Sequence, residues 1–153
     1  MLIWVHDDAL GPTQPVFERY RKADAAYVFD DAVIEHRLYG LKRLHFIAGC
    51  LEAMGEHKPV ASYHGDTAET LAALAEAGGH DEIATMATPC PKLKQVMRAL
   101  EADYGLTLTV VPPTALVHLE EEPDLKRFSR YWRKAQKTAF KSAELPLFKR
   151  PQP

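Results

Sequence analysis

The feature that most constrains the fold is a short apolar run near the start of the chain, Leu2-Ile3-Trp4-Val5, which stops abruptly at His6-Asp7-Asp8. Consecutive apolar residues are typical of a strand that is buried on both faces, as in the centre of a parallel sheet. Open α/β sheets bind ligands beyond the carboxyl ends of their strands, where these polar residues would lie. The opening residues therefore predict a ligand pocket rather than a chemical step.

Strand-like and helix-like segments alternate strictly along the first 111 residues. The expected strands are residues 2–5, 25–29, 60–64, 82–86 and 106–111, and the expected helices are residues 13–21, 36–54, 66–77 and 92–104. Strict alternation predicts parallel strands joined by right-handed crossovers, with helices on both faces. We therefore predict an α/β fold of three layers, a doubly wound five-stranded parallel sheet with strand order 3-2-1-4-5.

Local signals set the expected helix boundaries. Thr13 is expected to cap the first helix, and Asp66 with Glu69 forms an Asp-x-x-Glu capping arrangement at the start of the third. The longest helix, residues 36–54, has apolar residues at spacings of three and four. Its predicted buried face is Leu38, Leu41, Leu44 or His45, Ala48, Leu51 and Met54.

The predicted order makes strands 1 and 4 neighbours, so the switch point of the sheet lies between their ends. The expected ligand-contacting residues are His6, Asp7, Asp8, Thr88, Pro89 and Cys90, with Ala87 beside them and Asp30 and Asp31 at the flank. These side chains would orient the hydroxyls or ring nitrogens of a ligand. The simpler alternative is a solvated strand end, since Asp is common in turns. No nucleophile or general-base pair is visible, so no catalytic residue is predicted.

Several function classes are not supported by the sequence. It contains neither Gly-x-Gly-x-x-Gly nor Gly-x-x-x-x-Gly-Lys-Ser/Thr, so neither a dinucleotide fingerprint nor a P-loop is predicted. None of the seven histidines falls in a metal-ligand spacing, and no metal site is expected. The sequence has no long apolar stretch and no signal-peptide pattern, and Cys50 and Cys90 do not have a redox spacing. We therefore expect a reduced, cytoplasmic protein that does not contact membranes.

The character of the chain changes after Pro113, and we predict an α/β domain at 1–117 followed by a linker-like segment at 118–153. Residues 126–150 hold nine Lys and Arg against a single acid, Glu144. Asp124 is expected to cap a basic amphipathic helix that runs to about Lys141. Its apolar face is Phe128, Tyr131, Trp132, Ala135 and Ala139. Docking of this face on protein, including a second copy in a homodimer, is favoured over direct nucleic-acid contact.

Five segments resemble motifs of one family in the same order along the chain: residues 2–8, 27–30, 43–51, 63–66 and 128–134. The family is the photolyase/cryptochrome family, and the chain is similar to its N-terminal domain. The segment at 2–8 resembles its opening strand, usually Trp-Phe-Arg-x-Asp-Leu-Arg, and the segment at 128–134 resembles the start of its interdomain linker. The departures are His6 in place of arginine, Ala9-Leu10 in place of Leu-Arg, Thr67 in place of proline, and a loop at 87–91 without the usual acidic and aromatic residues.

The resemblance implies a Rossmann-like domain that holds a light-harvesting cofactor, namely a folate, a deazaflavin or a flavin nucleotide. In this family a separate helical domain binds FAD and performs DNA repair. The resemblance thus implies that this chain has no FAD site of its own, is not catalytic alone, and meets a separate helical FAD-binding domain. The alternative is a ligand-free interaction or regulatory module that docks through its C-terminal helix. A hydrolase or nucleotidyl transferase is disfavoured because the phosphate loops of such enzymes are missing.

Overall fold

The computed structural model describes residues 1–36, 38–115, 117, 119, 122 and 126–139. The chain divides into two compact units, Met1–Pro113 and Thr114–Pro153. The first contains β1 (Leu2–Val5), the 3-10 helix η1 (Asp7–Ala9), α1 (Pro15–Arg19), β2 (Asp24–Asp30), α2 (Asp31–Glu35), α3 (Leu41–Gly55), β3 (Ala61–Gly65), α4 (Thr67–Ala77), β4 (Glu82–Met86), α5 (Pro91–Ala102) and β5 (Thr107–Val111). The second contains α6 (Phe128–Ala139).

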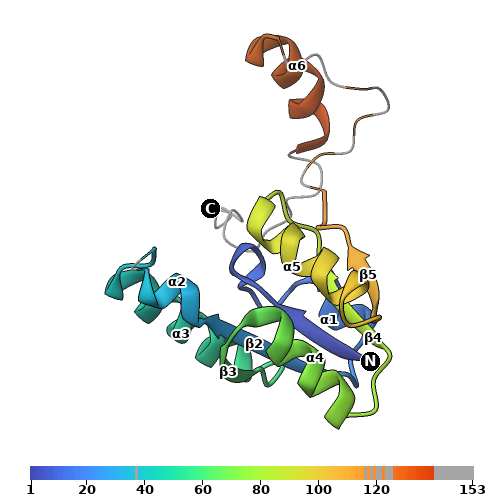
Figure 1. Cartoon of the computed structure of the whole chain (residues 1–153). Coiled ribbons are helices and arrows are strands. Elements are labelled where there is room, and N and C mark those ends of the chain that lie inside the picture. Colours follow the sequence, from blue (N-terminus) through green and yellow to red (C-terminus); the bar gives the residue numbers. More distant parts are fainter. Residues whose placement is uncertain (37, 116, 118, 120–121, 123–125, 140–153) are drawn as a thin grey trace. The chain divides into compact units, whose positions relative to one another are not determined.

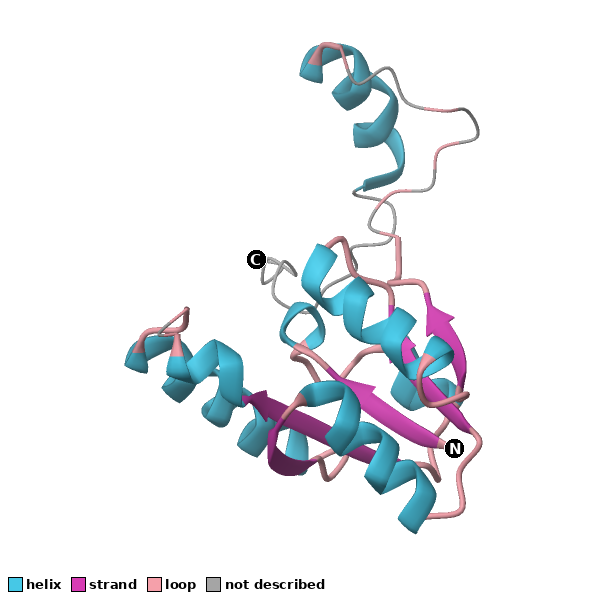
Figure 2. Cartoon of the chain, in the orientation of Figure 1, coloured by secondary structure: helices cyan, strands magenta, loops and turns pink. Residues whose placement is uncertain are grey.

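The first unit is built on a five-stranded sheet of order β3-β2-β1-β4-β5, which confirms the predicted topology (Figure 1). All four strand pairings are parallel. The apolar opening run is the central strand, with Val5 opposite Tyr27 of β2 and Trp4 opposite Thr85 of β4. The sheet is the buried middle layer between two sets of helices (Figure 2).

Alternating side chains of β1 supply the two halves of the core. Ile3 and Val5 pack with residues of α1 and α3, whereas Leu2 and Trp4 pack with residues of α4 and α5. All four side chains are buried. This two-sided burial explains why the opening run is apolar at every position.

The predicted helix at 36–54 is wrong at its start. Asp30 accepts a hydrogen bond from the Val33 backbone N–H and caps a separate short helix, α2. The chain is then extended at Gly40, which is the N-cap of α3. An Asx cap and a glycine, which is a poor helix former, together separate the two helices.

The expected buried face of the long helix also needs correction. The buried residues of α3 are Ile47, Leu51 and Met54, and the exposed Ala48 does not belong to them. Leu41 remains 72% exposed because it lies in the first turn of a helix that begins later than predicted. Leu38 lies before the helix and is also exposed.

Of the two predicted helix caps, one is present in the structure and the other is not. Asp66 accepts a hydrogen bond from the Glu69 backbone N–H at 3.0 Å and caps α4, as predicted. Thr13 does not cap α1, because that helix begins at Pro15 with Gln14 at its N-cap. Proline favours the first position of a helix, where its missing N–H costs nothing, and this sets the later start.

The second unit contains the predicted basic amphipathic helix, α6. Phe128 and Trp132 stack, with ring centroids 5.9 Å apart and planes inclined by 13°. The predicted cap Asp124 and the predicted helix end at Lys141 lie outside the described residues. In the ranges that the structure describes, no helix is long and apolar enough to span a bilayer.

Candidate functional site

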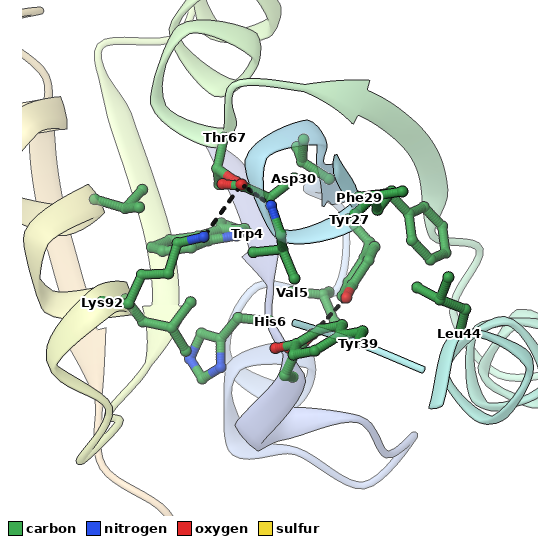
Figure 3. Close-up of a pocket in the computed structure, with 16 residues that line it drawn as sticks. Trp4, Val5, His6, Tyr27, Phe29, Asp30, Tyr39, Leu44, Thr67 and Lys92 are labelled. Atoms are coloured by element: carbon green, nitrogen blue, oxygen red, sulfur yellow. Dashed lines mark hydrogen bonds and ion pairs between the residues drawn. The ribbon is translucent and has the colours of Figure 1, made fainter. Parts of the chain in front are cut away.

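A cavity of about 50 Å³ lies at the carboxyl ends of β1 and β2. The strands contribute side chains from both faces of the sheet, and the first turns of α4 and α5 contribute Thr67 and Lys92 (Figure 3). Its walls are Trp4, Val5, His6, Asp7, Tyr27, Val28, Phe29, Asp30, Val33, Ile34, Tyr39, Leu44, Thr67, Lys92, Leu93 and Val96. The cavity therefore combines aromatic rings, aliphatic side chains and two carboxylates.

Asp30 is the polar centre on one side of the cavity. Its carboxylate accepts hydrogen bonds from the Thr67 hydroxyl at 2.8 Å, the Val33 backbone N–H at 3.1 Å and the Lys92 ammonium at 3.1 Å. Partial burial acts to raise the pKa of Asp30, but these hydrogen bonds outweigh it and hold the pKa below its usual value. Asp30 is therefore a charged, fully engaged carboxylate.

Asp7 is the polar centre on the other side. Its carboxylate accepts hydrogen bonds from the hydroxyls of Tyr27 and Tyr39, and the Arg43 guanidinium lies 3.6 Å away. Arg43 also covers the ring of Tyr39, with its guanidinium carbon 4.1 Å from the ring centroid. This cluster joins β2 to the segment before α3 and fixes two aromatic rings on the cavity wall.

The tyrosine hydroxyls of this cluster resist ionisation. Burial, followed by the hydrogen bond to Asp7, raises the pKa of Tyr27 and raises that of Tyr39 to about 12. Both side chains therefore stay neutral at ordinary pH and act as hydrogen-bond donors. Neither is suited to serve as a general base there.

His6 lines the cavity, but its ring nitrogens are occupied by the protein. The Nε2 atom bonds the Met86 carbonyl oxygen at 2.9 Å, and the Nδ1 atom bonds the Asp8 backbone N–H at 3.3 Å. Because a carbonyl only accepts and an amide N–H only donates, the proton is on Nε2. The residue is 2% exposed and ties the end of β1 to the end of β4.

The other predicted site residues lie outside the cavity wall. Asp8 accepts a hydrogen bond from the buried Thr88 hydroxyl, whose oxygen accepts from the Cys90 backbone N–H at 3.0 Å. Pro89 is exposed, and the Asp31 carboxylate lies 3.7 Å from the exposed His64 ring. The structure thus brings together His6, Asp7 and Asp30 on the cavity, and the other five predicted residues do not line it.

Sequence reasoning missed the residues that give the cavity its shape, notably Trp4, Tyr27, Tyr39, Thr67 and Lys92. The sequence pattern places Trp4 and Tyr27 in buried strands. It places Lys92 and Thr67 in the first turns of helices, and neither is among the predicted site residues. A usable signal existed, because the first turns of helices that follow parallel strands lie at the same sheet edge as the strand ends.

The arrangement can hold and orient a ligand. In the described part of the chain, no three His, Cys, Asp or Glu side chains gather to hold a metal ion. The two cavity carboxylates are both paired to hydrogen-bond donors of the protein. The cavity thus offers a ligand aromatic surfaces and hydrogen-bond donors.

No protein-family model matches this chain, and no curated protein matches it either. The parallel sheet of order β3-β2-β1-β4-β5 defines the fold, and this architecture supports many unrelated functions. The function must therefore be argued from the cavity and from the exposed surface of α6.

Proposed function

We propose that the first unit is a photolyase-like cofactor-binding domain that holds a planar aromatic or nucleotide-like cofactor. The candidates are a folate, a deazaflavin or a flavin nucleotide. The observation that carries the proposal is the convergence of aromatic rings and paired polar groups on one cavity at the carboxyl edge of a doubly wound sheet. Ligand sites of this fold class lie at this edge.

The dimensions of the cavity limit how a cofactor fits. The enclosed volume is about 50 Å³, whereas pockets for drug-sized ligands measure roughly 300–1,000 Å³. One edge of a ring system fits inside, and the remainder of the cofactor would lie across the mouth. There Lys92, whose side chain is 45% exposed, and Tyr39 would flank it.

Such a cofactor supplies absorption of near-ultraviolet or blue light. The residues of this chain would hold the cofactor in position. Asp30 and Asp7 fix the side chains of the polar and aromatic walls, and the strands hold these two carboxylates in place. A separate helical FAD-binding domain is the proposed partner that uses the absorbed energy. No side chain makes or breaks a bond in this scheme.

The test is an absorption and fluorescence spectrum of the purified protein, with mass spectrometry of anything released on denaturation. Flavin mononucleotide, a deazaflavin and a reduced folate are then titrated into the colourless fraction. The half-buried Val96 lines the cavity, and Val96→Phe should weaken uptake by roughly tenfold or more through steric filling. Val110→Phe, on the edge strand β5, adds the same ring outside the cavity and should leave binding unchanged.

This proposal is wrong if the purified protein carries no chromophore and takes up none of the three cofactors titrated into it. If Val96→Phe and Val110→Phe lower the cofactor affinity equally, the cofactor binds outside this cavity. Both variants need a far-ultraviolet circular dichroism spectrum like that of the wild type, so that a folding defect is recognised.

A second candidate function, a protein-interaction or regulatory module, is favoured by the surface of α6. Phe128 is 73% exposed and stacks on Trp132 on a helix that is otherwise rich in basic residues. We propose docking of this aromatic surface on protein, including a second copy of the chain. Light scattering over a concentration series should then show association, and Phe128→Ser should abolish it.

The matched control is Tyr104→Ser, which removes an exposed aromatic ring from the first unit. It should leave association unchanged. A chain that stays monomeric at every concentration excludes the homodimer form of this proposal.

A further inference from the structure

Trp4 presents a polar group that the protein itself does not use. The side chain is 2% exposed and lines the cavity at the carboxyl end of β1. Among the described residues, its indole N–H makes no hydrogen bond. No side-chain nitrogen or oxygen in those residues is both fully buried and without a hydrogen-bond partner. The indole nitrogen is therefore not sealed off from solvent, and Trp4 is one of the side chains that line the cavity (Figure 3).

Lys92 provides further donors on the same cavity. Its ammonium bonds the Asp30 carboxylate at 3.1 Å, and an ammonium has three N–H groups. One N–H is used by Asp30, so the others remain for a ligand at the mouth. Trp4 and Lys92 come from β1 and α5, and the sheet brings them to one place.

The acceptors of the cavity are already engaged. Asp30 takes three hydrogen bonds from the protein, and Asp7 takes two from tyrosine hydroxyls with Arg43 beside it. The cavity therefore offers a ligand mainly hydrogen-bond donors. A ligand edge that carries only N–H donors would leave the Trp4 N–H unpaired, whereas an edge that carries an acceptor would satisfy it.

We infer that this cavity selects ligands whose inserted edge carries a carbonyl oxygen, which Trp4 and Lys92 bind as hydrogen-bond donors. This inference rests on the proposed function for the cofactor class and specifies which edge enters. The volume of about 50 Å³ admits a ring edge with its carbonyl. The lactam carbonyl of a flavin, deazaflavin or pterin has this chemistry, and a purely hydrocarbon edge does not.

The test observes the indole N–H directly in the intact chain. The sequence has two tryptophans, so a ¹⁵N-labelled sample gives two indole signals, and Trp132→Phe identifies that of Trp4. Riboflavin is titrated first, and 2-pyridone, a single-ring lactam much smaller than riboflavin, is titrated second. We expect the Trp4 N–H signal to move downfield and to exchange more slowly with water, while that of Trp132 is unchanged.

Affinity gives the second measurement. Trp4→Phe keeps an aromatic ring and removes the N–H, and it should weaken riboflavin binding by about tenfold, as expected for loss of one hydrogen bond to an otherwise desolvated acceptor. Trp132→Phe makes the same chemical change in the other unit and should leave the affinity unchanged. If Trp4→Phe does not fold, the titration of the wild-type indole signal decides the question alone.

The outcomes separate the inference from the proposed function. Riboflavin binding with an unresponsive Trp4 N–H overturns the inference and leaves the cofactor proposal standing. A response to 2-pyridone without riboflavin binding supports the donor site and counts against the cofactor. No response to either probe overturns the inference.

Discussion

Asp30 couples the stability of this fold to pH. Its pKa lies below the usual value in the folded protein, so its contribution to stability is complete above the unfolded-state pKa, about 3.9. That contribution is lost as the pH falls through the folded-state pKa. We expect Asp30→Asn to lower the free energy of unfolding at neutral pH by about 1–2 kcal/mol, because the ion pair with Lys92 and one acceptor oxygen are removed.

Urea unfolding at a series of pH values measures this effect. The wild type should lose stability below about pH 4, and Asp30→Asn should lose less over the same interval. Asp31→Asn is the control, because the Asp31 side chain is 50% exposed and its carboxylate lies 3.7 Å from the His64 ring. Parallel pH profiles of wild type and Asp30→Asn would show that another group dominates.

At the scale of elements, the turn from β3 into α4 depends on one glycine. Gly65 has φ of +137°, and an added Cβ would lie 2.8 Å from the Thr70 hydroxyl oxygen. We expect Gly65→Ala to destabilise the protein by about 1–3 kcal/mol, from backbone strain and crowding. Chemical denaturation provides the measurement.

Gly49→Ala is the matched control within α3. Apart from the two chain neighbours and the nearby backbone of α3, no described atom comes within 4 Å of the added Cβ. Alanine favours helix, so this variant should gain about 0.5–1 kcal/mol. Equal stabilities of the two variants would contradict the role given to the Gly65 turn.

Elements and topology were largely predictable from the sequence because they depend on local pattern. The opening run, the alternation of strands and helices, and the Asp66 cap each appear in contiguous residues. The division between α2 and α3 was missed because Asp30 was interpreted as a strand-end carboxylate, although it also caps a helix. One polar residue at a strand end is compatible with both roles.

The candidate site was less predictable because it depends on distant residues. His6 and Asp7 follow β1, and Asp30 is the last residue of β2, so the topology alone places all three at the edge of the sheet. The contact of Lys92 with Asp30 joins residues 62 positions apart, and no local pattern contains it. The open indole N–H of Trp4 likewise follows only from the packing around it.

At the scale of the whole molecule, the division into two units has a direct consequence. Every strand of the sheet lies within Met1–Pro113. We therefore expect a chain that ends after Pro113 to unfold cooperatively, at a melting temperature within about 4 °C of the full chain, which corresponds to less than roughly 1 kcal/mol. Thermal unfolding followed by circular dichroism measures it, and loss of the cooperative transition would show that α6 is part of the folding unit.

The hydrogen bonds from His6 to Met86 and from Thr88 to Asp8 cross from the end of β1 to the end of β4. They extend the connection between these strands past the backbone ladder. They therefore fix the end of β1, from which His6 and Asp7 line the cavity. A ligand in the cavity would meet a strand end that is already ordered, so binding would not carry the entropic cost of ordering it.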